Sequence, residues 1–219
     1  MHALYRFVSG PLAWVAFGLF FGGMLFQLTR TLRQVRQKEP FIFTYMSLRY
    51  SLRSLAHWLT PFAALGWRQR PVLTVVTFLF HISLLVTPIF ALAHIVLWEE
   101  AWNISWWGLP DSIADGLTVI VCASCVFFAL RRRIAPEVRF VTDASDFLLL
   151  TLTAAPFVTG FLAYHQWTAG PWMTLAHMLS GEILLSAIPF TRLSHMLFGW
   201  LTRSYMGSEF GGVRHARDW

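Results

Sequence analysis

Five long apolar stretches alternate with more polar segments along the chain. They lie at residues 11–28, 71–98, 112–130, 147–164 and 172–200. Each stretch supplies the ~20 apolar residues that cross the hydrocarbon core of a bilayer as an α-helix. The pattern therefore predicts an all-α integral membrane protein with five transmembrane helices, organised as one domain over residues 1–219.

The segment between the first two stretches has a different pattern. Arg49 and Arg53 are four residues apart, and leucines recur at helical spacing near another face of the same segment. A helix with one basic and one apolar face lies in the plane of the membrane surface. We therefore expect an amphipathic surface helix over residues 41–66. A poorly ordered basic loop is the alternative.

Composition and charge support a membrane protein and set its expected orientation. Only 13% of residues are charged, against about 25% in soluble domains. Of the Lys and Arg residues, eight fall in 29–70, four in 131–146 and three after Trp200, whereas 99–111 and 165–171 hold none. Because cytoplasmic loops carry the excess of basic residues, we expect the N-terminus outside and the C-terminus in the cytoplasm. This distribution also argues against a nucleic-acid partner.

Four of the eight histidines fall inside predicted spans. His81 and His94 lie in the second span, and His177 and His195 lie in the fifth. Ionisable side chains are costly in hydrocarbon and usually serve a function there. The two spans run antiparallel, which brings His81 level with His195 and His94 level with His177. Two imidazoles that face each other at one depth suit a six-coordinate b-type haem.

Helical spacing favours the two pairs unequally. His177 and His195 are 18 residues apart, about five turns, so an unbroken helix places them on one face. His81 and His94 are 13 apart, which is about 220° around an ideal helix. Pro88 lies between them, and a proline kink shifts the angular register. We predict one haem at His81 and His195 and, given a kink at Pro88, a second at His94 and His177.

Two stretches resemble the membrane cytochrome b (gamma) subunit of respiratory nitrate reductase. Residues 131–150 read RRRIAPEVRFVTDASDFLLL, and residues 177–195 read HMLSGEILLSAIPFTRLSH, with a His-x3-Gly and a PF[ST]RL-x-His ending. FLFHISLL around His81 adds to a resemblance that covers roughly residues 70–200. The wider family includes the cytochrome b membrane subunits of sulfur-metabolising and heterodisulfide-reductase-like complexes.

The resemblance implies an electron-transfer subunit of a quinol-linked oxidoreductase complex, rather than a complete enzyme, in the cytoplasmic (inner) membrane of a prokaryote. Electrons would pass between menaquinol or ubiquinol and a cytoplasmic iron–sulfur subunit through two haems b. By resemblance, His81 and His195 would ligate the inner haem iron, and His94 and His177 the outer one.

Other side chains near the spans each have two interpretations. Arg192 would neutralise a haem propionate or reach to the lipid headgroups. Glu182 would relay protons, or it would be protonated and bonded to a neighbouring helix. We interpret Cys122 and Cys125 as packing residues rather than a redox pair, and His165 as a solvated loop residue or a functional one.

A haem-free membrane anchor or small-solute channel subunit is the competing function. The buried histidines would then serve as hydrogen-bonding groups between helices.

Overall fold

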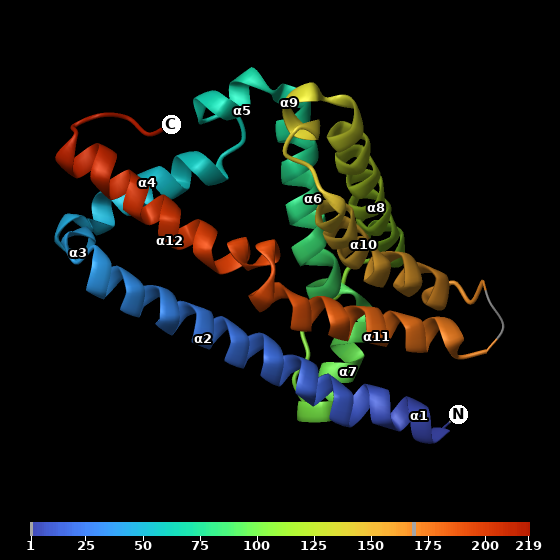
Figure 1. The fold of residues 1–219 in the computed structure, drawn as a ribbon. Coiled ribbons are helices and arrows are strands. Elements are labelled where there is room, and N and C mark those ends of the chain that lie inside the picture. Colours follow the sequence, from blue (N-terminus) through green and yellow to red (C-terminus); the bar gives the residue numbers. More distant parts are fainter. Residues whose placement is uncertain (1, 168–169) are drawn as a thin grey trace. The chain divides into compact units, whose positions relative to one another are not determined.

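The structure, a computed structural model, describes residues 2–167 and 170–219 and contains no strand within them (Figure 1). Five of its helical segments are long and apolar enough to cross a membrane: His2–Lys38, Pro71–Phe90, Asp111–Ile134, Ala144–Tyr164 and Trp172–Phe190. The prediction of an all-α protein with five membrane-spanning helices is confirmed. The chain is a multi-pass membrane protein.

The helices have the following bounds in chain order. They are α1 (His2–Phe7), η1 (Val8–Leu12), α2 (Ala13–Lys38), α3 (Phe41–Tyr45), α4 (Leu48–Leu59), α5 (Leu65–Gln69), α6 (Pro71–Phe90), α7 (Leu92–Trp102), α8 (Asp111–Ile134), α9 (Pro136–Arg139), α10 (Ala144–Tyr164), α11 (Trp172–Ala187), η2 (Ile188–Phe190), η3 (Arg192–Ser194), α12 (His195–Ser208) and η4 (Glu209–Val213).

Contacts among these helices divide the chain into two compact units. Unit 1 comprises residues 2–8 and the described part of 76–184, and unit 2 comprises residues 9–75 and 185–219. The chain passes from one unit to the other at three points, within η1, α6 and α11, so neither unit is a single stretch of the sequence.

Unit 1 has a small apolar core between α6, α8 and α10. The core residues Phe80, Val121 and Cys125 are buried, and Val121 is completely enclosed. The Phe80 ring meets the Phe128 ring edge-on, with centroids 5.4 Å apart. Side-chain packing of this kind holds membrane helices together because lipid tails are as apolar as the helices themselves.

A polar contact joins α8 to the start of α10. Arg132 on α8 forms an ion pair of 3.1 Å with Asp146, whose side chain is only 4% exposed. Asp146 also accepts from the backbone N–H of Asp143, while Asp143 caps the first turn of α10, which makes a capping box. The acidic residues at the start of α10 therefore cap this helix and also hold it against α8.

The second predicted span, 71–98, is two helices rather than one. α6 ends at Phe90, and α7 begins at Leu92, because Ala91 is extended with ψ of 127°. Pro88 lies in the last turn of α6, and a proline removes one backbone hydrogen bond and clashes with the preceding turn. The kink expected at Pro88 is thus a complete break three residues later.

Thr87 O keeps its helical donor, Ala91 N–H at 2.9 Å, but the break leaves the next three carbonyls of α6 without helical donors. Each of the three accepts another hydrogen bond: Pro88 O from His94 Nδ1 at 2.7 Å, Ile89 O from Trp106 Nε1 at 2.9 Å and Phe90 O from Leu109 N–H at 2.9 Å. The loop after α7 therefore supplies two of the donors that the end of α6 lacks.

The fifth predicted span, 172–200, is also interrupted. α11 ends at Ala187, two short 3-10 turns follow, and α12 begins at His195. Pro189 lies in the first of these turns, and Thr191 is extended, so the α-helical hydrogen bonds do not continue. The prediction of one helix over 172–200 is wrong. His177 and His195 therefore do not lie on one face of a single unbroken helix.

Unit 2 packs the long helix α2 against η2 at a glycine. A Cβ added to Gly23 would lie 2.7 Å from Pro189 Cβ, so only glycine permits this approach. Gln27, one turn further along α2, donates its side-chain amide to Pro189 O at 3.2 Å.

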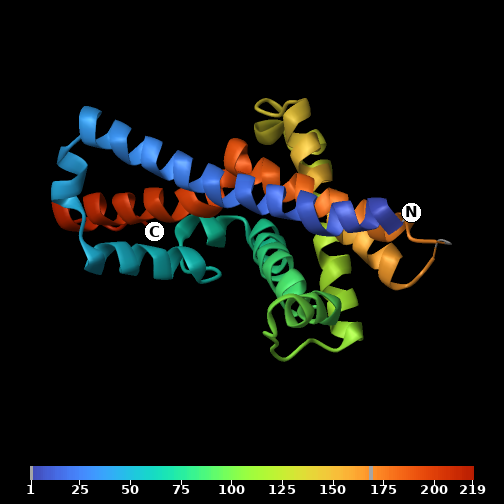
Figure 2. The same ribbon diagram turned by 90° about the horizontal axis from the view of Figure 1, so that it is seen from below.

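The predicted surface helix over 41–66 is present as three shorter helices, α3, α4 and α5. α4 is amphipathic, as expected, and its leucines Leu48, Leu52 and Leu59 are 76%, 56% and 46% exposed. The other side of α4 lies along α12 in both views (Figures 1 and 2).

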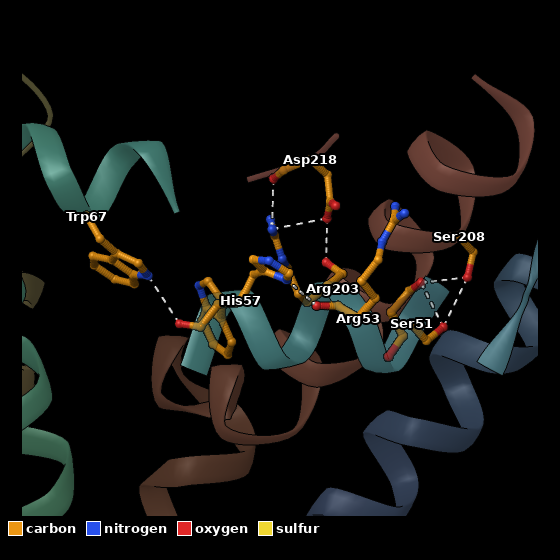
Figure 3. A network of polar contacts seen from close by, with 10 residues as sticks. Ser51, Arg53, His57, Trp67, Arg203, Ser208 and Asp218 are labelled. Carbon is orange, nitrogen blue, oxygen red and sulfur yellow. Dashed lines mark hydrogen bonds and ion pairs between the residues drawn. The ribbon is translucent and has the colours of Figure 1, made fainter. Parts of the chain in front are cut away.

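Small residues let α4 and α12 come close together. A Cβ on Gly207 would lie 2.3 Å from Ser54 Cβ, and a Cβ on Gly211 would lie 2.3 Å from Tyr50 Cδ1. Between these points the hydroxyls of Ser51 and Ser208 are hydrogen-bonded at 3.0 Å (Figure 3). The contact therefore resembles the small-residue seams of membrane helix pairs.

Gly207→Ala is expected to destabilise the α4–α12 contact by about 1–3 kcal/mol, because the new methyl group overpacks it. Gly199→Ala on the same helix is the matched control, since its Cβ would meet only the Trp58 ring at 3.7 Å. Thermal unfolding in detergent measures both. Equal melting temperatures for the two variants would contradict the seam.

Candidate functional site

His94 lies in the first turn of α7, immediately after the α6 break. Its Nδ1 is 2.7 Å from Pro88 O, one of the carbonyls that the break left without a helical donor. Trp106 and Leu109 donate hydrogen bonds to the two following carbonyls, those of Ile89 and Phe90. The direction of the His94 ring is therefore set by the way the helix ends rather than by the helical repeat.

His177 lies on α11 and points at α10. Its Nδ1 is 2.8 Å from Pro156 O, and a Cβ on Gly160 would lie 2.9 Å from its Cε1 and Nδ1 atoms. The ring thus occupies space that only a glycine leaves open. Thr159 and Ser180 are also hydrogen-bonded across the same two helices at 3.2 Å.

These two elements bring His94 and His177 together within unit 1. Their ring centroids are 5.8 Å apart, and the ring planes are within 8° of parallel. Imidazole nitrogens bind metals at about 2.0–2.1 Å, so one metal ion between two imidazoles separates the centroids by about 6 Å. An offset pair of rings in direct contact has centroids at about 4.5–7 Å as well. The centroid distance is therefore compatible with both arrangements.

The hydrogen bonds fix which nitrogen of each ring carries the proton. A carbonyl oxygen can only accept, so Nδ1 donates in His94 and His177, and Nε2 of each neutral ring keeps its lone pair. Metal-bound histidines usually donate their other ring nitrogen to a carbonyl or carboxylate in this way. His57, in unit 2, also bonds a carbonyl through Nδ1, so the distinguishing feature of His94 and His177 is that two such rings lie together.

The described residues contain no cluster of three or more His, Cys, Asp or Glu side chains that could hold a metal ion. A metal at His94 and His177 would have two protein ligands. This donor set suits a metal that brings its remaining ligands with it, as the iron of a haem does, and fits a bare ion poorly. The residues present therefore fit the predicted outer haem.

The other predicted ligands lie in different units. His81, in unit 1, bonds Thr77 O through Nδ1 at 2.8 Å, and His195, in unit 2, bonds Arg192 O at 2.9 Å. Both rings thus have the same proton arrangement as the outer pair. The pairing of His81 with His195, and a role for Arg192 at a propionate, stay predictions.

Glu182 and the two cysteines lie inside the spans of unit 1. Glu182 Oε2 is buried and has no hydrogen-bond partner among the described residues. Cys125 is part of the apolar core, and Cys122 lines a wholly apolar hollow between α8 and α10, with both thiols free. These positions agree with the interpretation of the cysteines as packing residues.

His165 is paired rather than simply solvated. Its Nε2 lies 3.1 Å from both carboxylate oxygens of Asp115, which joins the end of α10 to the start of α8. The rings of Phe161 and Tyr164 lie against it, at centroid distances of 4.5 and 5.3 Å.

The sequence reasoning missed the residues that position the two rings. Trp106, Pro156 and Gly160 are not among the predicted site residues. One signal was available, because a proline followed four residues later by a glycine inside an apolar span marks backbone that another group can approach.

Comparisons with known proteins give one informative relationship. No family model matches the chain, and no solved structure matches it. A protein of Nitratidesulfovibrio vulgaris (strain Hildenborough) that carries no functional name is 37% identical over 214 residues, which cover 94% of this chain and 93% of the other. The similarity therefore extends through both units, and the chain belongs to the same family as this protein.

Proposed function

We propose that the chain is a membrane cytochrome b subunit, which passes electrons between a quinol or quinone and a partner protein. The observation that carries this proposal is the pair formed by His94 and His177, two parallel imidazoles 5.8 Å apart whose Nδ1 protons are both committed to backbone carbonyls. The resemblance of residues 131–150 and 177–195 to the nitrate reductase gamma subunit supports it independently.

The four histidines would form two haem-binding sites. His94 and His177 would hold an outer haem b, with Gly160 leaving room for the His177 ring. His81 and His195 would hold an inner haem b, and Arg192 would neutralise a propionate. Bound haem would supply reversible one-electron transfer, and menaquinol or ubiquinol would be the diffusible substrate.

The proposed orientation places the His94–His177 end outside the cell and the C-terminus in the cytoplasm of a prokaryotic cell, across its inner membrane. The basic residues of 29–70 and 131–146 support this orientation. Trp98 contacts Trp102 and Trp106 beyond the His94 turn. Such a tryptophan cluster is typical of a membrane interface.

A soluble iron–sulfur subunit of a larger oxidoreductase complex would dock at the cytoplasmic face, over segment 40–70 and the C-terminal tail. Exposed Phe41, Phe43 and Tyr45 beside Arg49 support this surface, because aromatic and Arg residues are enriched at interfaces.

One observation favours the haem-free anchor or channel as a second candidate. The bond from His177 to Pro156 O joins α11 to α10, which is also the role of a structural histidine between helices. The two candidates differ in whether the purified protein has the colour of a b-type cytochrome.

A reduced-minus-oxidised spectrum of the purified chain is expected to show a b-type α-band. His177→Ala and His195→Ala are each expected to lower haem per chain by about half, because each removes one of the two side chains that would hold a haem. Pyridine-haemochrome analysis measures this quantity. A folded wild-type protein without haem would eliminate the proposal in favour of the anchor.

Gly160→Ala is expected to lower outer-haem occupancy without unfolding the chain, since the added methyl group displaces the His177 ring. Gly181→Ala, on α11 four residues after His177, is the control because nothing lies within 4 Å of its Cβ. Potentiometric titration of the α-band separates the two haems. An unchanged titration in Gly160→Ala would contradict the ring position.

Purification in mild detergent is expected to co-isolate an iron–sulfur protein. Arg49→Asp should weaken this association, since it reverses charge on the proposed docking surface, while the haem spectrum is unchanged. Arg6→Asp, at the end predicted to lie outside, is the control. Equal recovery of the partner with both variants would refute docking at α4.

A further inference from the structure

The tail segment, residues 214–219, folds back onto α4 and α12. The chain reverses at His215, which has a φ of 49°, a left-handed conformation that few residues other than glycine adopt. The turn is closed by a hydrogen bond from Ala216 N–H to Phe210 O at 2.8 Å. Arg214 donates to Glu209 at its start and lowers the pKa of that carboxyl. Asp218 and Trp219 are thereby brought against α4.

The side chain of Asp218 is completely buried. Its Oδ2 lies 3.0 Å from Arg203 Nη2 of α12 and accepts a hydrogen bond from the Ser54 hydroxyl of α4. Arg203 also donates to the backbone carbonyl of Asp218 at 2.8 Å (Figure 3). One acidic residue thus connects the two helices.

Trp219 completes the contact with its ring. It stacks on the His57 ring with centroids 4.0 Å apart, and Arg53 Cζ lies 4.6 Å from its centroid. Arg53 also lies over Tyr50 at 4.8 Å, so its guanidinium is held by cation–π contacts on two rings. Together Ser54, Arg203, Arg53 and His57 accommodate a carboxylate followed by an aromatic ring, and we name these four residues the acidic-tail site.

The tail satisfies this site incompletely. Within the described residues, Nε and Nη2 of Arg53, Nε of Arg203 and Oδ1 of Asp218 are buried without hydrogen-bond partners. Buried polar groups are normally paired, and guanidinium groups bind carboxylates best through two parallel bonds. A segment with an additional carboxylate or carbonyl oxygen near Arg53 would use donors that the tail leaves unused.

The site faces away from the part of α4 suited to lipid. At 100° per residue, Arg53 and His57 lie roughly 100–180° around the helix from the exposed leucines Leu48, Leu52 and Leu59. If the leucines lie on the membrane, the acidic-tail site faces water. This placement favours a segment of a water-soluble protein over a lipid headgroup.

We propose that the acidic-tail site binds an acidic residue followed by an aromatic residue in a segment of a water-soluble protein, and that Asp218 and Trp219 occupy the site as a tethered competitor. The partner's segment takes the place of the tail when the two proteins dock. The use of the site by the docking partner rests on the proposed function, whereas the site itself depends only on contacts within unit 2.

The test uses the full-length chain with Asp218→Asn and Trp219→Ala as the receptor, which releases the tail without shortening the protein. The probe is a fluorescent peptide of residues 210–219, FGGVRHARDW, amidated so that Asp218 provides its only carboxylate. Fluorescence anisotropy is expected to show about tenfold tighter binding to this receptor than to the wild-type chain, in which the tail competes.

Matched changes identify the contacts. Asp218→Asn in the peptide, or Arg203→Gln in the receptor, should weaken binding by about tenfold or more, because each removes a charge-assisted hydrogen bond. Arg217→Gln in the peptide and Arg33→Gln, on the exposed surface of α2 in the receptor, are the controls and should change little. The peptide variant keeps the test valid if the receptor variant misfolds.

Equal binding to the wild-type chain and the receptor, or equal binding of the Asp218→Asn peptide, would overturn the proposal. Phosphatidylglycerol vesicles that capture the released receptor more strongly than the wild-type chain, with no peptide binding, would also overturn it, in favour of a lipid ligand. Haem content is not part of the readout, so failure here differs from failure of the cytochrome proposal.

Discussion

The hydrogen bond from His94 to Pro88 O is the interaction on which the candidate site depends. A backbone carbonyl inside a membrane must find a donor, because no water is available to supply one. The break in α6 near Pro88 leaves three carbonyls without helical donors, and they accept hydrogen bonds from an imidazole, an indole and a backbone amide. The requirement to satisfy these carbonyls therefore orients His94 and folds the following loop over the break.

The same need to pair every backbone N–H and C=O within the membrane explains which predictions from the sequence hold. Apolar length and charge placement predict helices and their number, because every spanning segment must satisfy its own hydrogen bonds. They do not predict where a helix stops within an apolar run. Pro88 and Pro189 both lie in such runs. Pro88 precedes the break after α6, and Pro189 lies within the break after α11, and the hydropathy pattern shows neither break.

For the candidate ligands too, the sequence predicts some features and not others. Histidine in an apolar span is a strong signal, and His94 with His177 is the pair that the structure brings together. An ideal helix does not predict the proximity of His94 and His177 without the kink at Pro88, and it predicts an unbroken helix between His177 and His195 that the structure does not have. The supporting residues Pro156 and Gly160 act through a carbonyl and a missing side chain, so their only signal in the sequence is a proline and a glycine four residues apart within an apolar span.

The central claim is that His94 and His177 ligate one haem iron, and the electron paramagnetic resonance spectrum of the oxidised protein tests it most directly. Two axial imidazoles with ring planes within 8° of parallel predict a rhombic low-spin ferric signal, which His177→Ala should abolish while the signal from the other haem persists. A wild-type protein without a low-spin signal, or a His177→Ala variant with an unchanged spectrum, would contradict the account.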